Sequence, residues 1–168
     1  MTVFYCSKCG TALTPDLAAL PAVPVVPNLD QARPEGARQA PATVPRGRYA
    51  IELEPWGAPF IRQQDQDNPV PAQPRGPLMA TQDEGFVISA GTRNTVVIHP
   101  DDAPALQPLP RWENSTGCCG PNGTEGPNRA CICGARVATL AADCFGPYEL
   151  HLDPVRTYAF EVLQDQFG

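Results

Sequence analysis

Residues 117–144 read GCCGPNGTEGPNRACICGARVATLAADC and hold most of the cysteines of the chain. Five of the seven lie here: Cys118, Cys119, Cys131, Cys133 and Cys144. The other two, Cys6 and Cys9, form a Cys-x-x-Cys-Gly turn near the N-terminus. Two thiolates three positions apart around a tight turn make up half of a typical tetrahedral zinc site. The cysteines therefore predict a domain that metal ions hold together.

The rest of the chain offers little else to stabilise a fold. It has 168 residues, of which 42% are hydrophobic and about a fifth are proline or glycine. Thirteen of the 21 prolines fall between Pro15 and Pro77, so most regular structure must come from the C-terminal half. A core of about 80–90 residues is marginal by buried area alone, and this is where a metal or disulfide staple is most needed.

The net charge, and the lack of a signal peptide or membrane-span pattern in the sequence, limit the classes of protein to which this chain could belong. A net charge of −6 argues against nucleic acid, whose phosphates need a basic surface, and against an anionic membrane. A protein partner with basic residues would suit this charge better. No signal peptide opens the chain and no run approaches the roughly 18 apolar residues of a membrane span, so we expect a cytoplasmic protein. In a reducing cytoplasm, clustered cysteines indicate metal ligands before disulfides.

The hydrophobic pattern predicts a mostly β protein with small antiparallel sheets, zinc-ribbon-like metal sites and long Pro-rich irregular segments. Strands are expected at residues 2–5, 48–54, 85–89, 95–99, 136–140, 148–152 and 157–162. For 157–162 a short helix is the alternative, and β-propensity favours the strand. In the strand at 48–54 the alternation places Tyr49, Ile51 and Leu53 on the buried side. The strands at 85–89 and 95–99 are expected to form a hairpin.

The N-terminal part is predicted to be an arm rather than a separate core. Residues 1–47 would carry the first cysteine pair and a Pro-rich segment that packs on a β-rich domain of residues 48–168. We expect one or two helical turns at 14–20, followed by an extended stretch that buries valines and ends in a polar linker at 28–47. A ligand for an SH3-type domain is the alternative for this stretch. Residues 62–77 are predicted to be a mobile loop.

Two turn regions complete this description. Trp56 is expected to cover the edge of a small core, with a binding platform as the alternative. His99, at a strand end before a turn, is expected to be a hydrogen-bonding rim residue. Trp112 is the next apolar side chain before the cysteine-rich stretch.

The seven cysteines and His151 make eight ligands, which is enough for two tetrahedral zinc sites. In one arrangement, Cys6 and Cys9 join Cys131 and Cys133 in a split zinc ribbon. A second ion is then left with Cys118 or Cys119, Cys144 and His151.

A local arrangement is the alternative. One site would consist of Cys119, Cys131, Cys133 and Cys144. Cys118 is then spare, and the N-terminal pair has no partner within the chain. In both arrangements a thiolate-rich site favours a borderline ion, and zinc is the commonest structural choice, as one or two ions.

Two segments of the sequence resemble cysteine-rich motifs of other proteins. Tyr5–Gly10, YCSKCG, resembles the first knuckle of zinc-ribbon proteins over these six residues. Gly117–Leu152 resembles a recurring Cys-rich module of uncharacterised proteins from high-GC bacteria. The short Cys131-Ile-Cys133 spacing departs from the two-residue spacer of a zinc ribbon.

These features favour a zinc-stapled protein-interaction module with a protein partner. A thiol–zinc redox switch, in which the vicinal pair Cys118 and Cys119 oxidises and releases metal, is a second hypothesis. A zinc enzyme is the third, with Glu125 or Glu149 as the nearest base by sequence. Catalysis is disfavoured because no His-Glu-x-x-His, deaminase or nucleophile-elbow motif occurs.

Metal removal tests the central hypothesis. A structural zinc contributes of order 10 kcal/mol, whereas whole domains are stable by only about 5–15 kcal/mol. A strong chelator should therefore lower the melting temperature sharply, and elemental analysis should find at least one zinc per chain. Metal-free protein with unchanged melting would refute the hypothesis.

Overall fold

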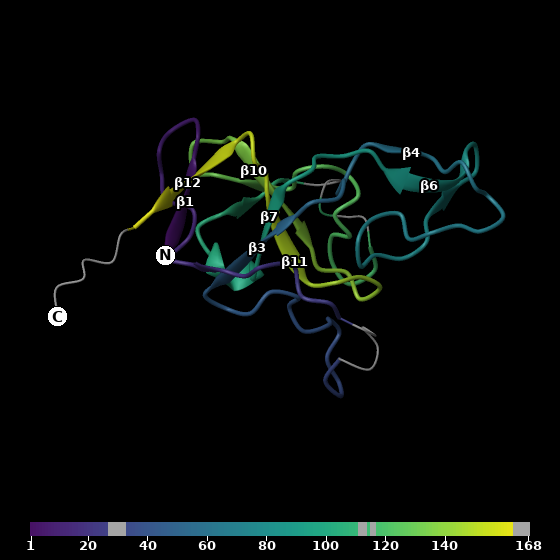
Figure 1. Ribbon diagram of the computed structural model, residues 1–168, viewed down its shortest axis with the longest axis horizontal. Coiled ribbons are helices and arrows are strands. Elements are labelled where there is room, and N and C mark those ends of the chain that lie inside the picture. The colour runs from purple at the N-terminus through teal and green to yellow at the C-terminus, as the bar shows by residue number, and fades with distance from the viewer. Residues whose placement is uncertain (27–32, 111–113, 115–116, 163–168) are drawn as a thin grey trace.

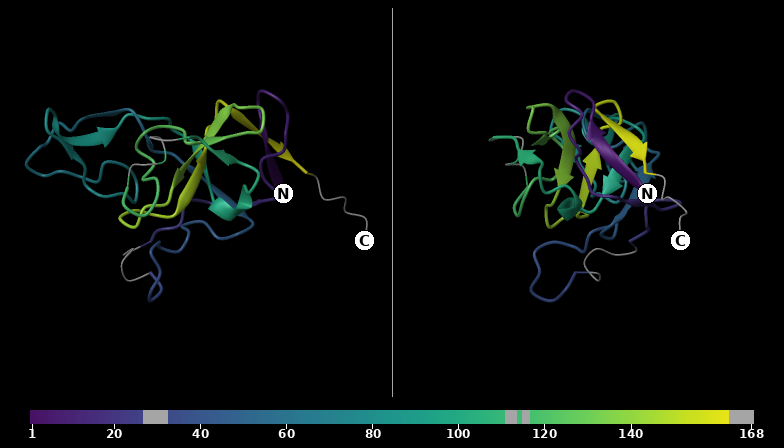
Figure 2. Two further views of the ribbon diagram at one scale, coloured as in Figure 1. Left: turned by 180° about the vertical axis from the view of Figure 1, so that it is seen from behind. Right: turned by 90° about the vertical axis from the view of Figure 1, so that its left-hand side faces the viewer.

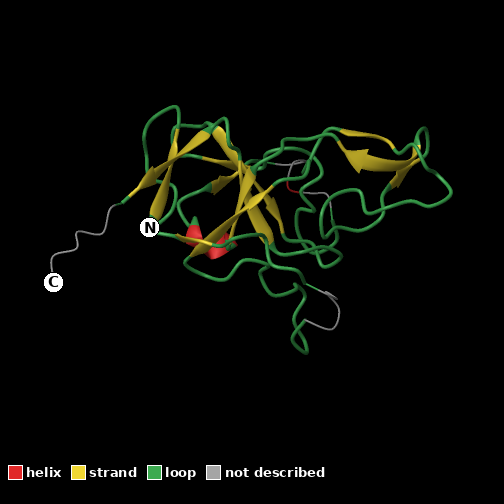
Figure 3. Ribbon diagram, in the orientation of Figure 1, coloured by secondary structure: helices red, strands yellow, loops and turns green. Residues whose placement is uncertain are grey.

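The computed structural model describes residues 1–26, 33–110, 114 and 117–162. This part of the chain is mostly strand and irregular loop, with one short 3-10 turn and two cysteine-rich groups (Figures 1 and 3). The predicted mostly β class is confirmed. Trp112 lies outside the described residues.

The strands are short. In chain order they are β1 (Thr2–Cys6), β2 (Ala18–Ala19), β3 (Arg48–Glu52), β4 (Phe60–Arg62), β5 (Ala80–Thr81), β6 (Gly85–Ser89), β7 (Thr95–Ile98), β8 (Gln107–Pro108), β9 (Arg129–Ala130), β10 (Arg136–Ala141), β11 (Glu149–Leu152) and β12 (Thr157–Glu161). The 3-10 turn η1 covers Pro100–Asp102, and His99 caps it by accepting the amide hydrogen of Asp101 at Nδ1. The predicted rim role of His99 is confirmed.

Three sheets lie in a row along the molecule (Figure 1). A seven-stranded sheet with the order β2-β3-β7-β11-β10-β9-β8 forms the centre. The two-stranded ribbon β1–β12 lies at one end, and the sheet β4-β6-β5 lies at the other. The end view in Figure 2 shows β1 and β12 side by side. The pairing of β2 with β3 is parallel, so the central sheet is mixed rather than wholly antiparallel.

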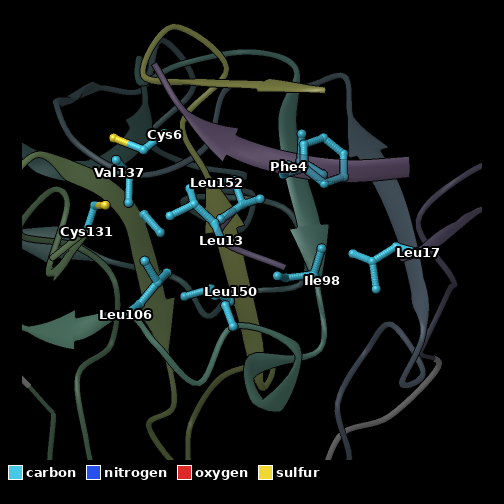
Figure 4. Packing of buried hydrophobic residues seen from close by; sticks show 13 residues of the cluster. Phe4, Cys6, Leu13, Leu17, Ile98, Leu106, Cys131, Val137, Leu150 and Leu152 are labelled. Carbon is cyan, nitrogen blue, oxygen red and sulfur yellow. The ribbon is translucent and has the colours of Figure 1, made fainter. Parts of the chain in front are cut away.

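The main hydrophobic cluster lies between the β1–β12 end and the central sheet. Strand β7 is buried at every residue, as its continuous apolar character predicts. Strand β11 is buried at every residue too, although it carries Glu149 and His151. Their Ile98, Leu150 and Leu152 pack against Leu13 and Phe4 from the N-terminal segment (Figure 4). The N-terminal segment thus belongs to the core that the C-terminal half builds.

Residues 14–20 are extended and not helical, which corrects the prediction. The backbones of Thr2 and Leu17 exchange two hydrogen bonds, and β2 pairs with the start of β3. This pairing satisfies the backbone groups that a single helical turn would have left open. Beyond it, Val23 is half-buried against the sheet, but Val25 is 89% exposed.

The segment predicted to be a polar linker carries buried residues as well. Ala40 and Val44 are buried, and Val44 packs with Ala50 and Val97 on the central sheet. The amide of Thr43 donates to the carbonyl of Tyr148 at 3.2 Å. Residues 27–32 of the predicted arm and linker lie outside the described part of the chain.

The predicted hairpin between 85–89 and 95–99 is wrong, although both strands exist. Strand β6 pairs with β4 and β5, whereas β7 lies between β3 and β11. The connection between them bonds to the β3–β4 segment instead, with Ala90 donating to Pro59 and Asn94 donating to Glu52. The chain therefore crosses from one sheet to the next at this loop.

The face of β3 is also inverted relative to the prediction. Ala50 and Glu52 are buried, whereas Ile51 is 38% and Leu53 is 65% exposed. The side chains of β3 alternate between buried and exposed as predicted, but the buried side is the one that carries Glu52. A carboxylate can be buried at modest cost only when a partner neutralises it.

That partner is Arg75, which lies in the segment predicted to be a mobile loop. Its Nη1 donates to Glu52 at 2.6 Å, and its Nε and Nη2 donate to Glu149 at 2.5 and 3.1 Å. The Arg75 side chain is 15% exposed and Glu149 is fully buried. Residues 62–77 are thus fastened to β3 and β11 through one guanidinium.

We expect Arg75→Gln to destabilise the protein by about 3–5 kcal/mol, because it leaves two buried carboxylates without a cation. Chemical denaturation of the zinc-loaded protein measures this change. Arg93→Gln is the matched control, since Arg93 and Glu54 are both more than half exposed and such pairs contribute at most about 1 kcal/mol. Equal effects of the two substitutions would show that the Arg75 pairs do not stabilise the fold.

Candidate metal centres

The first cysteine group is built by two similar turns far apart in sequence. Cys6 ends β1, and Gly10 donates its amide to the Cys6 carbonyl at 2.8 Å. Cys131 follows β9, and Gly134 donates to the Cys131 carbonyl at 2.8 Å. Gly10 and Gly134 both have positive φ, at 72° and 83°, a backbone conformation that glycine adopts without strain.

The sulfurs of Cys6, Cys9, Cys131 and Cys133 lie within 4.8 Å of one another. Two cross-turn Sγ–Sγ distances are 3.7 Å for Cys6–Cys133 and 3.6 Å for Cys9–Cys131. Tetrahedral coordination at a Zn–S distance of about 2.3 Å requires sulfurs about 3.8 Å apart. The four thiols therefore lie close enough together to bind a single ion.

Burial differs within this group. Cys6 and Cys131 are buried members of the main hydrophobic cluster, and both lie at its edge in Figure 4. Burial raises the pKa of Cys131 to about 12, so without a cation this thiol stays protonated. Hydrogen bonds with Thr11 lower the pKa of the exposed Cys9 to about 6. Because thiolates are the metal-binding form, this lowered pKa favours the metal-binding form of Cys9 at neutral pH.

The second group lies on loops between strands. It contains Cys118, Cys119 and Cys144 with the carboxylate of Asp143, and its ligand atoms also lie within 4.8 Å of one another. The Cys118 sulfur is 3.5 Å from that of Cys119 and 3.0 Å from that of Cys144. Cys118 and Cys119 are exposed and Cys144 is half-buried, in contrast to the first group.

The structure thus brings together the four cysteines of the split arrangement and places Cys119 and Cys144 in a different group. The local arrangement of Cys119, Cys131, Cys133 and Cys144 is not formed. Asp143 is a candidate ligand that the sequence reasoning missed. Its position beside Cys144 in a turn was the available signal, but a lone aspartate next to a cysteine is too common to single out.

His151 lies outside both groups, although the ligand count had included it. Its Nε2 is 2.7 Å from Glu149 Oε2 and its Nδ1 is 2.8 Å from Thr95 Oγ1. Although burial raises the pKa of Glu149, the hydrogen bonds and charges of His151 and Arg75 lower it to about 2. An ionised carboxylate only accepts, so Nε2 carries the proton and Nδ1 accepts from the Thr95 hydroxyl. Both ring nitrogens are therefore used within the protein.

The indole of Trp56 stacks on the His151 ring at a centroid distance of 3.6 Å. Trp56 is only 3% exposed, so it covers the core edge as predicted and offers no open platform. Glu149 lies in this network and Glu125 is exposed elsewhere, so neither proposed zinc-enzyme base belongs to a cysteine group.

Comparisons with models of protein families, with curated proteins and with solved structures give no match to this chain. Within the described residues, no helix has the length and hydrophobicity that crossing a bilayer requires. The two cysteine-rich groups are positioned to hold metal ions, and the chemistry of their donor atoms supports a function in metal binding.

The environment of His151 predicts a dependence of stability on pH. Burial lowers the pKa of His151 below its ordinary 6.5, whereas in the unfolded chain the ring keeps that value. As the pH falls below 6.5 the unfolded chain therefore binds more protons than the folded one, and the free energy of unfolding decreases.

Denaturation of the zinc-loaded protein between about pH 7 and pH 5.5 tests this dependence, because that interval brackets the ordinary histidine pKa. His151→Gln should flatten the slope of unfolding free energy against pH, whatever its effect on absolute stability. His99→Gln, at the only other histidine of the chain, should leave the slope unchanged. A slope that responds to His99 rather than His151 would contradict the assignment.

Proposed function

We propose that this protein is a zinc-stapled protein-interaction module, in which Cys6, Cys9, Cys131 and Cys133 hold a structural zinc ion. The observation that carries the proposal is the meeting of two glycine-closed cysteine turns at near-tetrahedral sulfur spacing. Four thiolates leave no open coordination position, which favours a structural role over a catalytic one.

The location of this site supports a structural role as well. The Cys6–Gly10 turn follows directly on β1, and the Cys131–Gly134 turn leads into β10 of the central sheet. An ion at this point ties the β1–β12 ribbon to the sheet at the edge of their shared hydrophobic cluster. Because the core is small, the free energy of metal binding becomes a large share of folding stability.

An apolar surface supports the interaction role. Tyr158 and Phe160 of β12 are 47% and 60% exposed, and within the described residues β1 is the only strand that pairs with β12. A groove of about 430 Å³ lies between this ribbon and β3, where Tyr49 and Ile51 line it. An open strand edge beside an apolar groove suits an extended peptide that adds to the sheet.

The net charge of −6 favours a partner segment with basic residues beside its apolar ones. Capture of partners from the host with wild-type protein and with an Ile51→Asp/Tyr158→Asp variant tests this role. A partner retained by the wild type and lost by the folded variant is expected. Equal capture by both proteins would place the interaction elsewhere.

Cys9→Ser tests the structural zinc. Cys9 is exposed, so the substitution removes a ligand without opening a cavity in the core. With a site contributing about 10–16 kcal/mol, loss of one of its thiolates should cost at least about 3 kcal/mol. This corresponds to a fall in melting temperature of about 6 °C or more.

Cys119→Ser is the matched control, since Cys119 is an exposed cysteine of the second group. It should leave the zinc of the first group in place and change the melting temperature much less. If Cys9→Ser retains full zinc content and wild-type melting, the first group is not the structural site.

A further inference from the structure

The second cysteine group has the donor atoms of a metal site but not those of the first one. Three thiols, from Cys118, Cys119 and Cys144, converge with one carboxylate, from Asp143. The Cys118 sulfur lies 3.6 Å from Asp143 Oδ1 and 3.0 Å from the Cys144 sulfur. A single pairing of thiols would use two of the sulfurs and leave both the third sulfur and the carboxylate without a role.

The Asp143 carboxylate is held in place by the backbone. Asp143 is 8% exposed, and its Oδ1 accepts the amide hydrogen of Cys119 at 3.1 Å. A buried carboxylate is costly unless it is hydrogen-bonded and neutralised. Among the described residues, no ion pair within 4.0 Å to a basic side chain is found for Asp143, so the hydrogen bonds orient it while its charge is left for a cation.

The loop that carries the vicinal cysteines fits closely around this carboxylate. A Cβ atom at Gly117 would lie 2.2 Å from the Gly120 carbonyl oxygen and 3.0 Å from Asp143 Cγ. Gly117 also has φ of +111°, which other residues rarely adopt. Gly117 therefore lets the Cys118–Cys119 backbone close over Asp143, and this brings the sulfurs to the carboxylate.

We propose that Cys118, Cys119, Cys144 and Asp143 form a second metal site, which binds a thiophilic divalent cation of the zinc and cadmium class through three sulfurs and one oxygen. The site is independent of the first one. It exchanges its ion readily, because Cys118 and Cys119 face solvent and all four ligands come from loops, one between β8 and β9 and one between β10 and β11. Binding releases the thiol protons, so that M²⁺ and three thiols yield a tris-thiolate carboxylate complex and three protons.

The surroundings suit such a complex. Three thiolates and a carboxylate around a divalent ion leave a net charge of about −2. Arg33 donates a hydrogen bond to the Cys144 carbonyl oxygen, so a cationic side chain lies close to the ligand loop. Hydrogen bonds from surrounding side chains to the ligand-bearing residues are typical of metal sites.

Cadmium substitution of the full-length, reduced protein tests the proposal, with ¹¹³Cd NMR as the readout. Two resonances are expected, one from a four-sulfur site and one from a site with three sulfurs and an oxygen. Chelator competition should remove the second ion at concentrations at least about tenfold lower than those that remove the first, since the second site is open to solvent.

Two variants assign the second resonance. Cys144→Ser should abolish it, keep the first resonance and change the melting temperature little. Asp143→Asn keeps an acceptor for the Cys119 amide but loses the charge, and should shift the second resonance and weaken cadmium binding there by about tenfold or more. Asp83→Asn, at an exposed aspartate, is the matched control and should change neither resonance.

The proposal is overturned if the reduced protein binds a single cadmium ion, or if Cys144→Ser retains both. In each of these outcomes the resonance of the four-sulfur site persists, so they are distinct from a failure of the structural zinc.

Discussion

The meeting of four sulfurs at one edge of the core is the constraint on which this fold depends. Cys6 and Cys133 are 127 positions apart, yet their sulfurs lie 3.7 Å from each other. Closing so long a loop costs conformational entropy, and hydrophobic burial in a chain rich in proline and glycine offers little to offset it. An ion bound by the four cysteines would supply this free energy at one point, where the N-terminal turn meets the start of β10. The turns themselves are inexpensive to form, because each contains a glycine at the position of positive φ.

Away from the metal, the interior is held by charge as well as by apolar contact. Arg75 joins Glu52 of β3 to Glu149 of β11, and Glu149 in turn accepts from His151. This buried chain of polar groups anchors the 62–77 segment to β3 and β11, beside the hydrogen bonds that Ala72 and Gln73 accept from Ser89 and Gly57. Such networks require every member to be satisfied, so they specify one arrangement of the loop more than they add to stability. The burial of Glu52 also turns Ile51 outward, toward the groove beside the β1–β12 ribbon.

The two cysteine groups differ in the properties that decide what a metal site does. The first is partly buried, consists of sulfur alone and connects separate elements of the fold, which suits a permanent structural ion. The second has two exposed cysteines, includes a carboxylate and lies on loops between strands. Mixed oxygen and sulfur ligands with solvent access favour exchange over permanence. One short chain thus presents both kinds of thiolate site.

The sequence by itself determined the local features. The cysteine spacing and the glycine after each pair are visible in the chain, as are the strands at β1, β7, β10, β11 and β12, because each depends on residues near one another. Only the tertiary structure decided which cysteine turns meet and that Asp143 rather than His151 joins the second group. It also decided that β6 and β7 belong to different sheets and which face of β3 is buried. These outcomes depend on partners remote in sequence. Arg75 pairs with Glu52, so the glutamate side of β3 is the buried one. The backbone of Trp56 bonds to Thr92, so the 90–94 loop lies against another segment and does not close a hairpin. Periodicity reports that a strand has two faces, but the contact that makes one of them the inside is formed only when the chain folds.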